Sequence, residues 1–426
     1  MRNFRQVILA GVAVSALVGA VSSARAGGFA LREQSAVGLG NAFAGAAAGG
    51  SGLGSMFWNP ATMTNFAGIQ SSLALFAIMP NSKITPTSGT SVALQLSNGL
   101  TDSGDMAQDA VIPASYASYQ VNDSVWLGLS INSPYGLVTQ NPHNWAGQIF
   151  GRTSKVMSIN ATPTLAYRIN DQLSVAAGVQ IMKFKVRLTQ ATGVSAGASS
   201  ATLEGDDIAF GYTLGATYKP MPGTEIGIGY RSQVKPKLEG TLTTGSPIDI
   251  HSDLTLPDQV TVGLRQTITD EFTFLTGFEW THWSKFTRFP VLTTSGATAT
   301  TLTFDYKNGW YASLGGEYKL NTAWTLRAGL GFEHSPINNE NRSVRLPDSN
   351  RTWTSIGATY ELNDQISFDA SYAHLFAKSG TITSTGSGLT LTANTKGSVD
   401  IFAVGLNFKL GAEPKKVATK AAMVTK

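Results

Sequence analysis

The stretch NDQLSVAAGVQIMKFKVR (residues 170–187) gives the clearest indication of the fold class. It opens on a turn-forming pair, Asn170-Asp171, and from residue 172 to 181 its side chains alternate in character. One face carries Leu173, Val175, Ala177, Val179 and Ile181, and the other carries Ser174, Gly178 and Gln180. Because successive side chains of a strand point to opposite faces, the pattern predicts a strand with one apolar face. Its length of about ten residues or more exceeds the ~5–6 residues usual in soluble sheets.

The pattern recurs in about fourteen strand-like segments between Gly68 and Leu410, joined by connections that alternate between short and long. The short ones centre on residues 122–123, 170–171, 220–223, 269–270, 321–322 and 363–364. The long ones fall near residues 80–108, 140–154, 190–205, 241–252, 288–302, 335–347 and 380–394. Outer-membrane barrels have tight periplasmic turns and long external loops, and a closed barrel satisfies every backbone group in lipid. The sequence therefore predicts an all-β fold over residues 68–410, an antiparallel transmembrane β-barrel of about 14 strands.

The composition agrees with a wall that faces lipid. Of the 426 residues, 42% are hydrophobic and only 14% are charged, and there are 45 glycines. Beyond the N-terminus no apolar run approaches the ~20 residues of a transmembrane helix. The chain has no cysteine, which excludes a disulfide framework and a thiolate metal site.

Residues 1–26 have the pattern of a secretory signal peptide. Arg2 and Arg5 precede an apolar run, residues 7–21, and Ala24-Arg25-Ala26 forms a small-x-small cleavage site. We expect cleavage after Ala26 and export to the outer membrane of a Gram-negative bacterium. The alternative, an uncleaved membrane anchor, conflicts with an apolar run that is short for spanning.

Cleavage also removes the apparent basicity of the chain. The formal net charge of +4 loses three arginines with residues 1–26 and falls to +1. Residues 411–426 carry four lysines and one glutamate, so residues 27–410 sum to −2. The charge therefore gives no reason to expect nucleic-acid binding, and residues 411–426 are predicted to be a basic, disordered tail.

Residues 27–67 lack strand alternation and are rich in Gly and Ala. Residues 42–48 could form a short helix, and Asn59-Pro60 interrupts regular structure. The apolar side chains among them need burial, which a floppy periplasmic extension would not give. We therefore predict a short N-terminal helical hatch that plugs the lumen.

One predicted strand contains residues that do not suit the interior of a sheet. Ser133-Pro134-Tyr135-Gly136 places a proline and a glycine inside the segment 125–139, which predicts a bend or a locally unpaired wall. Alternatively, the strand ends at Asn132 and Pro134 belongs to a loop. Elsewhere aromatic residues gather near segment ends, as expected of interfacial girdles: Trp280, Trp283, Phe286 and Trp353.

Three cations share one face of a single strand. Lys183, Lys185 and Arg187 keep the parity of the lipid-facing set that ends at Ile181. We expect them to point outward, at the level of lipopolysaccharide phosphates, which turns Phe184, Val186 and Leu188 inward as an apolar patch. The alternative, a lumenal cationic ladder for a carboxylate, requires a bulge.

The sequence carries no enzyme signature. The pattern Gly193-Val194-Ser195-Ala196-Gly197 lies in a Ser/Gly/Ala-rich stretch between two predicted strands, without the helix that a nucleophile elbow needs. The five histidines lack metal-ligand spacing, and no phosphate-binding loop is present. We therefore expect no catalytic residue, metal or cofactor.

Several motifs resemble the outer-membrane long-chain fatty acid transport family, which includes aromatic-hydrocarbon uptake proteins. They are Gly28-Phe29, SAVGLGNAF (35–43), Asn59-Pro60-Ala61, SPYGL (133–137), LPD (256–258), WSKF (283–286), NRS (341–343), LPD (346–348), Arg351 and Trp353. The resemblance covers nearly all of residues 27–410. It implies a monomeric barrel that takes up long-chain fatty acids passively, with a hatch and a lateral exit at a kinked strand. It also implies contact with outer-membrane lipid, lipopolysaccharide and the barrel assembly machinery.

The resemblance assigns roles to individual residues. Phe29 and Asn59, Pro60 and Ala61 would belong to the hatch, and Pro134, Tyr135 and Gly136 to the lateral opening. Phe29 would also contact ligand. Gln190 stands where the family has a basic pocket residue, which leaves Lys307 as the candidate partner of a carboxylate. That departure favours the alternative of neutral aromatic or alkane hydrocarbons, and a general diffusion porin is a second alternative.

Overall fold

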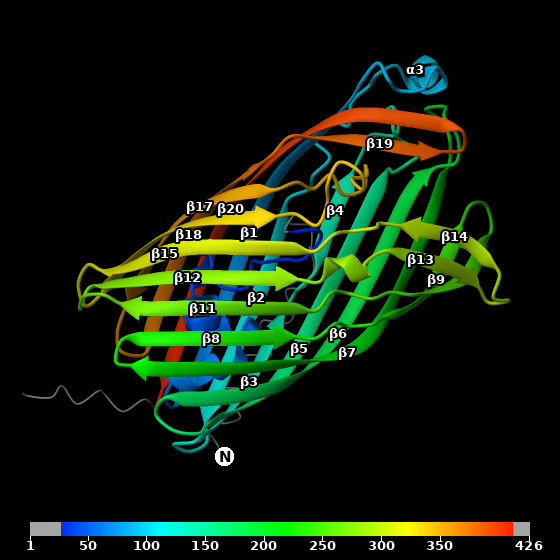
Figure 1. Ribbon diagram of the computed structural model, residues 1–426. Coiled ribbons are helices and arrows are strands. Elements are labelled where there is room, and N and C mark those ends of the chain that lie inside the picture. Colours follow the sequence, from blue (N-terminus) through cyan, green and yellow to red (C-terminus); the bar gives the residue numbers. More distant parts are fainter. Residues whose placement is uncertain (1–26, 412–426) are drawn as a thin grey trace, which may run out of the picture.

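The computed structural model describes residues 27–411, so the predicted signal peptide and all of the tail except Gly411 lie outside the described residues. Residues 69–410 form a closed antiparallel barrel of 14 wall strands (Figure 1). The wall strands are β1 (Ile69–Pro86), β2 (Ala110–Gln120), β3 (Val125–Asn132), β5 (Thr153–Arg168), β6 (Leu173–Ala191), β7 (Ser200–Met221), β8 (Thr224–Arg231), β11 (Gln259–Thr267), β12 (Phe272–Thr281), β15 (Gly309–Lys319), β16 (Trp324–His334), β17 (Arg351–Glu361), β18 (Ile366–Ala377) and β20 (Leu389–Leu410). The predicted fold class is confirmed.

The wall closes between the first and last strands. β1 pairs with β20 over its whole length, from Ile69 opposite Leu410 to Pro86 opposite Ala393. Every other wall strand pairs with its neighbours in chain order, and all the pairs are antiparallel. Closure leaves the sheet without an edge, which is the condition for a sheet to lie in lipid.

The short connections lie where the sequence predicted them, and most have one design. The side-chain oxygens of Asn122, Asn170, Asn321 and Asn363 each accept the backbone N–H groups two and three residues later. Thr269 Oγ1 does the same at the β11–β12 turn. These side chains satisfy amide groups that a tight turn leaves without ladder partners, which is why such residues favour turns.

The long connections differ from the prediction because much of them is strand. β9 (Lys237–Thr243) pairs with β7 on one side and with β10 (Pro247–Asp253) on the other. β13 (Arg288–Thr293) pairs with β10 and with β14 (Thr298–Thr303). β19 (Gly380–Gly386) pairs with β20. Only residues 192–199 separate β6 from β7. β14 and β19 are rich in Thr, whose branched side chain suits a strand, and they lack the apolar alternation that marks a lipid-facing strand. The remaining elements on this side are β4 (Gly136–Gln140), α3 (Val92–Asn98) and η5 (Trp283–Lys285).

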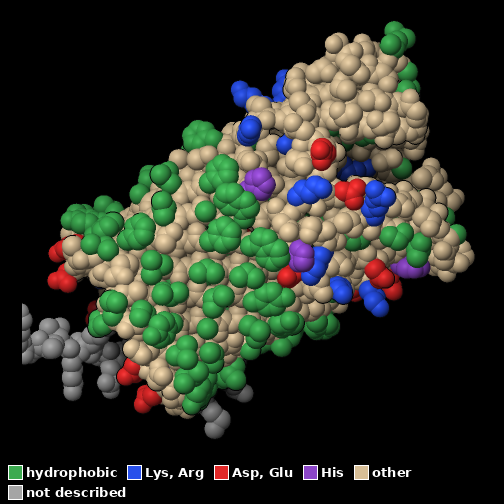
Figure 2. Space-filling view, viewed as in Figure 1, with side chains coloured by type: hydrophobic (Ala, Val, Ile, Leu, Met, Phe, Trp, Pro, Cys, Tyr) green, Lys and Arg blue, Asp and Glu red, His purple; other side chains and the backbone are tan. Residues whose placement is uncertain are grey.

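The outer face carries the expected apolar belt. Leu173, Val175, Ala177, Val179 and Ile181 of β6 are exposed or half-buried on it, while Ser174, Gly178 and Gln180 are buried on the inner face. Figure 2 shows hydrophobic side chains across the part of the wall near the short turns, and charged side chains gathered towards β13 and β14. Among the described residues, no helix is long and apolar enough to cross a membrane.

Residues 27–67, the N-terminal segment, lie inside the barrel and are mostly buried. Their elements are short: α2 (Ala36–Gly40), η2 (Ala46–Ala48), η3 (Gly52–Phe57) and η4 (Pro60–Asn65). The helix predicted over residues 42–48 is wrong, because Ala42 and Phe43 have positive φ and Gly45 is left-handed, so no continuous helix forms. The four elements contact wall strands around most of the circumference, including β1, β7, β11 and β17.

Glycines of the wall allow this close approach. A Cβ at Gly227 would overlap the carbonyl oxygen of Ala47, and one at Gly229 would overlap that of Trp58. Gly227 lies opposite Gly263, which in turn lies opposite Gly277 on the next strand, so the glycines form a row across the inner face. The backbone of the N-terminal segment therefore rests directly on the backbone of the wall, at positions where only glycine fits.

We predict that Gly227→Ala loosens the N-terminal segment. The added methyl group cannot coexist with the Ala47 carbonyl, and overpacking of this kind costs about 1–3 kcal/mol. Chymotrypsin should therefore cut at Phe43 or Phe57 faster in the folded variant than in the wild type, as followed by mass spectrometry. Gly197→Ala is the matched control, since a Cβ there meets open space. Equal cleavage rates in all three proteins would contradict the prediction.

Candidate functional site

An apolar cavity lies in the half of the barrel away from the short turns. It holds about 820 Å³ of empty space, a volume that includes open solvent. Its lining includes Phe29, Leu137, Val156, Phe184, Val186, Leu188, Leu254, Phe289 and Phe304. Phe184, Val186 and Leu188 thus point inward, and Lys183, Lys185 and Arg187 are exposed outside, as the strand parity predicted.

Phe29 forms the centre of an aromatic cluster at the floor of this cavity. Its ring centroid lies 4.8 Å from that of Trp283, 5.2 Å from Phe286 and 5.8 Å from Tyr135. The prediction that Trp283, Phe286 and Trp353 belong to an interfacial girdle is wrong, since all three are buried inside the barrel. Trp283 and Phe286 flank the short η5 turn after β12, which carries them inward, and only Trp280 faces outward.

One cation lines the apolar cavity among the described residues, and it is Arg345 in the loop between β16 and β17. Its Nη1 donates to the carbonyl of Thr189 at 3.1 Å, and its Nη2 donates to Gln190 Oε1 at 2.7 Å. No described carboxylate lies within 4.0 Å of its guanidinium group. Burial lowers the pKa of Arg345 to about 10, so the group remains protonated at neutral pH.

Lys307 and Gln190, the ligand contacts that the resemblance implied, do not line the apolar cavity. Lys307 is exposed and does not line the apolar cavity, so the structure offers no support for it as a carboxylate partner. Gln190 is also exposed, but its side chain holds the guanidinium of Arg345. Arg345 lies in a loop far from Gln190 in the sequence, and sequence order alone gives no sign of this contact.

The wall is interrupted where Pro134 suggested it. β3 ends at Asn132 and β4 begins at Gly136, and both pair with β5. β2 pairs with β3 from Gln120, opposite Trp126, to Ser115, opposite Ile131. Residues 110–114 of β2 have no ladder to β4. Both readings of the sequence were partly right, because strand β3 ends at Asn132 and the chain resumes in the wall four residues later.

Two sets of hydrogen bonds replace the ladder at residues 133–135, here called the kink. The hydroxyl of Ser158 on β5 accepts from the Tyr135 amide and donates to the Tyr135 carbonyl, both at 2.8 Å. The N-terminal segment supplies the rest: the Leu31 amide donates to the Pro134 carbonyl at 2.8 Å, and the Gly136 amide donates to the Phe29 carbonyl at 2.9 Å. Phe29 therefore contacts the cavity with its ring and the kink with its backbone.

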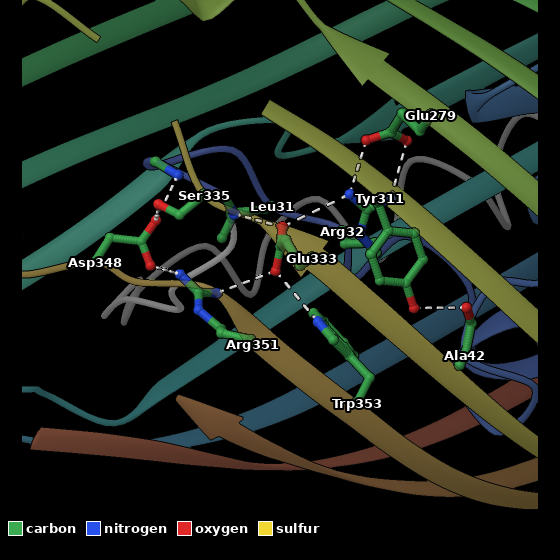
Figure 3. Close-up of polar contacts among 12 residues, drawn as sticks. Leu31, Arg32, Ala42, Glu279, Tyr311, Glu333, Ser335, Asp348, Arg351 and Trp353 are labelled. Carbon is green, nitrogen blue, oxygen red and sulfur yellow. Dashed lines mark hydrogen bonds and ion pairs between the residues drawn. The ribbon is translucent and has the colours of Figure 1, made fainter. Parts of the chain in front are cut away.

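A cluster of buried charges fixes the beginning of the N-terminal segment, and we call it the charged cluster: Arg32, Glu33, Glu279, Glu333, Asp348 and Arg351. The guanidinium of Arg32 pairs with Glu279 at 2.8 Å and approaches Glu333 to 3.7 Å (Figure 3). Arg351 pairs with Glu333 and with Asp348. Because charges buried without partners cost several kcal/mol each, these pairs specify the position of the segment more than they add stability.

Glu33 is the exception within the charged cluster, because neither of its carboxylate oxygens has a hydrogen-bond partner among the described residues. Burial raises the pKa of Glu33 to about 7, and the carboxylate of Glu333 adds to the effect. The backbone N–H of Glu33 itself and the guanidinium groups of Arg32 and Arg351 oppose this rise in pKa. Glu33 therefore changes its charge near neutral pH, unlike an exposed glutamate.

Asn59-Pro60-Ala61 lies apart from the apolar cavity. The Asn59 amide donates to the carbonyls of Ala47 at 2.6 Å and Ala216 on β7 at 2.9 Å, and its Oδ1 caps η4 through the Ala61 amide. These residues anchor the N-terminal segment to the wall and to itself. The structure thus brings Phe29 together with Tyr135, and leaves Asn59, Pro60 and Ala61 in a different part of the segment.

Comparison with known proteins identifies the fold and the family. The family model described as "Outer membrane protein transport protein (OMPP1/FadL/TodX)" matches residues 17–410. The chain belongs to this family. The family consists of outer-membrane transporters of hydrophobic compounds, not enzymes, and the barrel agrees with an outer-membrane location.

Two relatives with known names are similar to this chain over most of their length. The 47 kDa outer membrane protein of Pasteurella multocida is 29% identical over 443 residues, which cover 96% of this chain and 99% of that protein. The long-chain fatty acid transport protein of Escherichia coli K12 is 28% identical over 400 residues, or 83% of this chain and 88% of that one.

Solved structures show the same fold. The crystal structure of a Pseudomonas aeruginosa FadL homologue aligns with a TM-score of 0.81 and 23% identity, covering 90% of this chain and 99% of that one. The P. putida toluene transporter TodX aligns with a TM-score of 0.64 and 17% identity, covering 85% and 97%.

We predict that Glu33→Gln removes a pH-dependent destabilisation. Because the folded pKa of about 7 exceeds the ordinary 4.5, ionising Glu33 in the fold costs on the order of 3 kcal/mol. The stability of the wild type should fall as pH rises from about 4.5 to 7, so the variant should be the more stable above pH 7. Thermal unfolding in detergent at pH 5 and pH 8 measures this. Glu340→Gln, at an exposed loop residue, should change nothing, and a variant no more stable than the wild type at pH 8 would refute the assignment.

Proposed function

We propose that the protein takes up long-chain fatty acids, or similar amphiphilic carboxylates, by passive diffusion through the barrel. The observation that carries the proposal is Arg345, a protonated guanidinium group on an otherwise mostly apolar cavity, with no described carboxylate within ion-pairing distance. An uncompensated cation of this kind favours an anionic group on the ligand. The name of the E. coli relative supports the same ligand class.

The apolar cavity suits the other end of such a ligand. Each CH₂ group removed from water contributes about 0.8 kcal/mol, so a long alkyl chain gains far more in this cavity than in a water-filled lumen. Most of its lining consists of Phe, Leu, Val and Ile side chains, which suit an alkyl chain. A cation at the rim and an apolar interior together orient an amphiphile with its carboxylate at Arg345.

We predict that Arg345→Met lowers the affinity for oleate but not for toluene. Hydrogen bonds to charged groups contribute about 1.5–3 kcal/mol, which corresponds to a loss of about 10- to 150-fold for oleate. Arg345→Lys should retain part of the affinity because it keeps the charge. Binding to the purified protein, measured by calorimetry, gives the comparison.

Lys307→Ala is the matched control for this experiment, because it removes an exposed cation outside the apolar cavity. If Lys307→Ala weakened oleate binding and Arg345→Met did not, the sequence-based assignment would be right and this one wrong. If neither variant affected oleate binding, neither cation would hold the carboxylate, and the alternative of a neutral aromatic or alkane hydrocarbon would be favoured. The solved toluene transporters share the fold at 16–20% identity and do not decide between these ligands.

The exit that we propose is lateral, between β2 and β4 at the kink. Its support is the missing ladder between these strands and the contact of residues 29–31 with the kink. Ligand that displaces the Phe29 ring would also disturb the bond from Gly136 to the Phe29 carbonyl. In this scheme the N-terminal segment is a hatch, and the lumen behind it is closed to general diffusion.

A disulfide across the kink tests the exit. Ala30 and Tyr135 form an antiparallel bridge, so cysteines at these two positions are close enough to be joined, and the chain has no other cysteine. We expect the oxidised Ala30→Cys, Tyr135→Cys protein to lose most fatty acid uptake in cells and to regain it on reduction. The single Ala30→Cys variant controls for the substitution. Unchanged uptake in the oxidised protein would exclude this exit, and an open ion-conducting lumen in planar bilayers would favour the porin alternative.

A further inference from the structure

The N-terminal segment begins against two buried carboxylates. The backbone nitrogen of Gly27 donates to Glu333 Oε1 at 2.7 Å, and that of Gly28 donates to Asp348 Oδ2 at 3.0 Å. Glu333 is only 2% exposed and also accepts from the indole of Trp353. The first described nitrogen of the chain thus points at an ionisable group on the wall strand β16.

The charged cluster is short of positive charge. Within ion-pairing distance of one another are the guanidinium groups of Arg32 and Arg351 and the carboxylates of Glu279, Glu333 and Asp348. Two other arginines are not ion-paired with the cluster: Arg231 donates to the Phe57 carbonyl and to Gln180, and Arg342 donates to the backbone carbonyl of Asp348. With Glu33 protonated, one further cation would balance the cluster. An unbalanced buried charge is costly, so a missing cation is expected here.

The space around the first two residues is tight. A Cβ at Gly27 would lie 2.8 Å from Glu333 Oε1, and one at Gly28 would lie 2.9 Å from the Trp283 ring. Gly28 also has φ +68°, a conformation that residues with side chains rarely adopt. The slot therefore fits Gly27-Gly28, the two residues that follow the predicted cleavage site.

We propose that signal cleavage after Ala26 creates the missing cation, and that the new α-ammonium group of Gly27 pairs with Glu333. Hydrolysis by a signal-peptide-cleaving protease adds one water across the Ala26–Gly27 bond. Ala26 keeps the carboxylate, and the amine of Gly27 takes up a proton. Glu333 then acts as a positioning residue that holds residues 27–31, and hence Phe29, only in the processed protein.

The difference between the two forms is chemical. The amide of an unprocessed chain offers Glu333 one hydrogen and no charge, whereas an ammonium group offers three hydrogens and a full positive charge. Charge-assisted hydrogen bonds are roughly twice as strong as neutral ones. Maturation would therefore complete the cluster that fixes the N-terminal segment. This inference rests on the predicted cleavage and not on which ligand is transported.

Reductive dimethylation of the folded, ligand-free protein tests the pairing. At pH 7 a free α-amine reacts faster than lysine because its ordinary pKa is lower, about 7.7–8.0 against 10.4. We expect the Gly27 amine to react more slowly than the exposed Lys307 in the folded wild type, and faster after unfolding. In Glu333→Gln its labelling should rise about tenfold or more, since the buried partner is lost. Mass spectrometry of the N-terminal peptide measures the labelling of the Gly27 amine in the wild type and in Glu333→Gln.

The control is Glu317→Gln, which removes a carboxylate that pairs with Arg265 and Arg327. It should leave Gly27 labelling at the wild-type rate. Should Glu333→Gln fail to fold, the pH dependence of wild-type labelling decides the question, because pairing with Glu333 raises the pKa of the amine whereas burial alone lowers it. Retention of residues 1–26 in the folded protein, a Gly27 amine as reactive as Lys307, or no response to Glu333→Gln would each overturn the proposal. None of these outcomes depends on fatty acid binding.

Discussion

The structure depends on the requirement that every backbone amide and carbonyl inside a bilayer be hydrogen-bonded. Closure of β1 on β20 meets it around the wall, and at the kink other groups meet it in place of a neighbouring wall strand. Pro134 has no amide hydrogen to satisfy, Ser158 bonds both groups of Tyr135, and residues 29 and 31 bond Gly136 and Pro134. The N-terminal segment is thus also a structural part of the wall.

This arrangement links the apolar cavity to the kink through a single residue. The ring of Phe29 belongs to the aromatic floor of the cavity, and its carbonyl belongs to the hydrogen bonds at the kink. Two further sets of contacts keep the segment in register: the charged cluster at its start and the glycine row under its middle. Charged pairs tolerate little displacement when they are buried, and backbone contacts on glycine tolerate little extra volume.

Much of the fold could be predicted because it follows from local periodicity. The parity that ran through Ile181 placed Lys183 outside and Phe184 inside, and the Asn-containing pairs marked the turns. The errors came where periodicity carries no information. Trp283 and Phe286 lie at the end of a strand yet turn inward with η5, and the Thr-rich hairpins beyond the apolar belt have no lipid-facing side to reveal them.

The candidate site was less predictable, because its members come from distant parts of the chain. Phe29, Pro134, Tyr135 and Gly136 were identified through their resemblance to a family motif, as were Asp348 and Arg351 without a role, whereas the remaining members of the charged cluster and Arg345 were missed. Arg345 stands between Val344 and Leu346 in a loop, and nothing beside it in the sequence indicates that Gln190 would hold it. Glu33, Glu279 and Glu333 are likewise ordinary glutamates until the fold removes them from water.

The sequence by itself determined the barrel, because alternation and turn residues act between neighbours in the chain and need no tertiary partner. It also determined that residues 27–67 would have to be buried, because they are apolar and lack a strand pattern. Only the tertiary structure decided what lies at the cavity and what holds the N-terminal segment. Charge pairing and exclusion of volume depend on which side chains meet in space, and in this barrel the groups that meet are as far apart in sequence as Gly27 and Glu333.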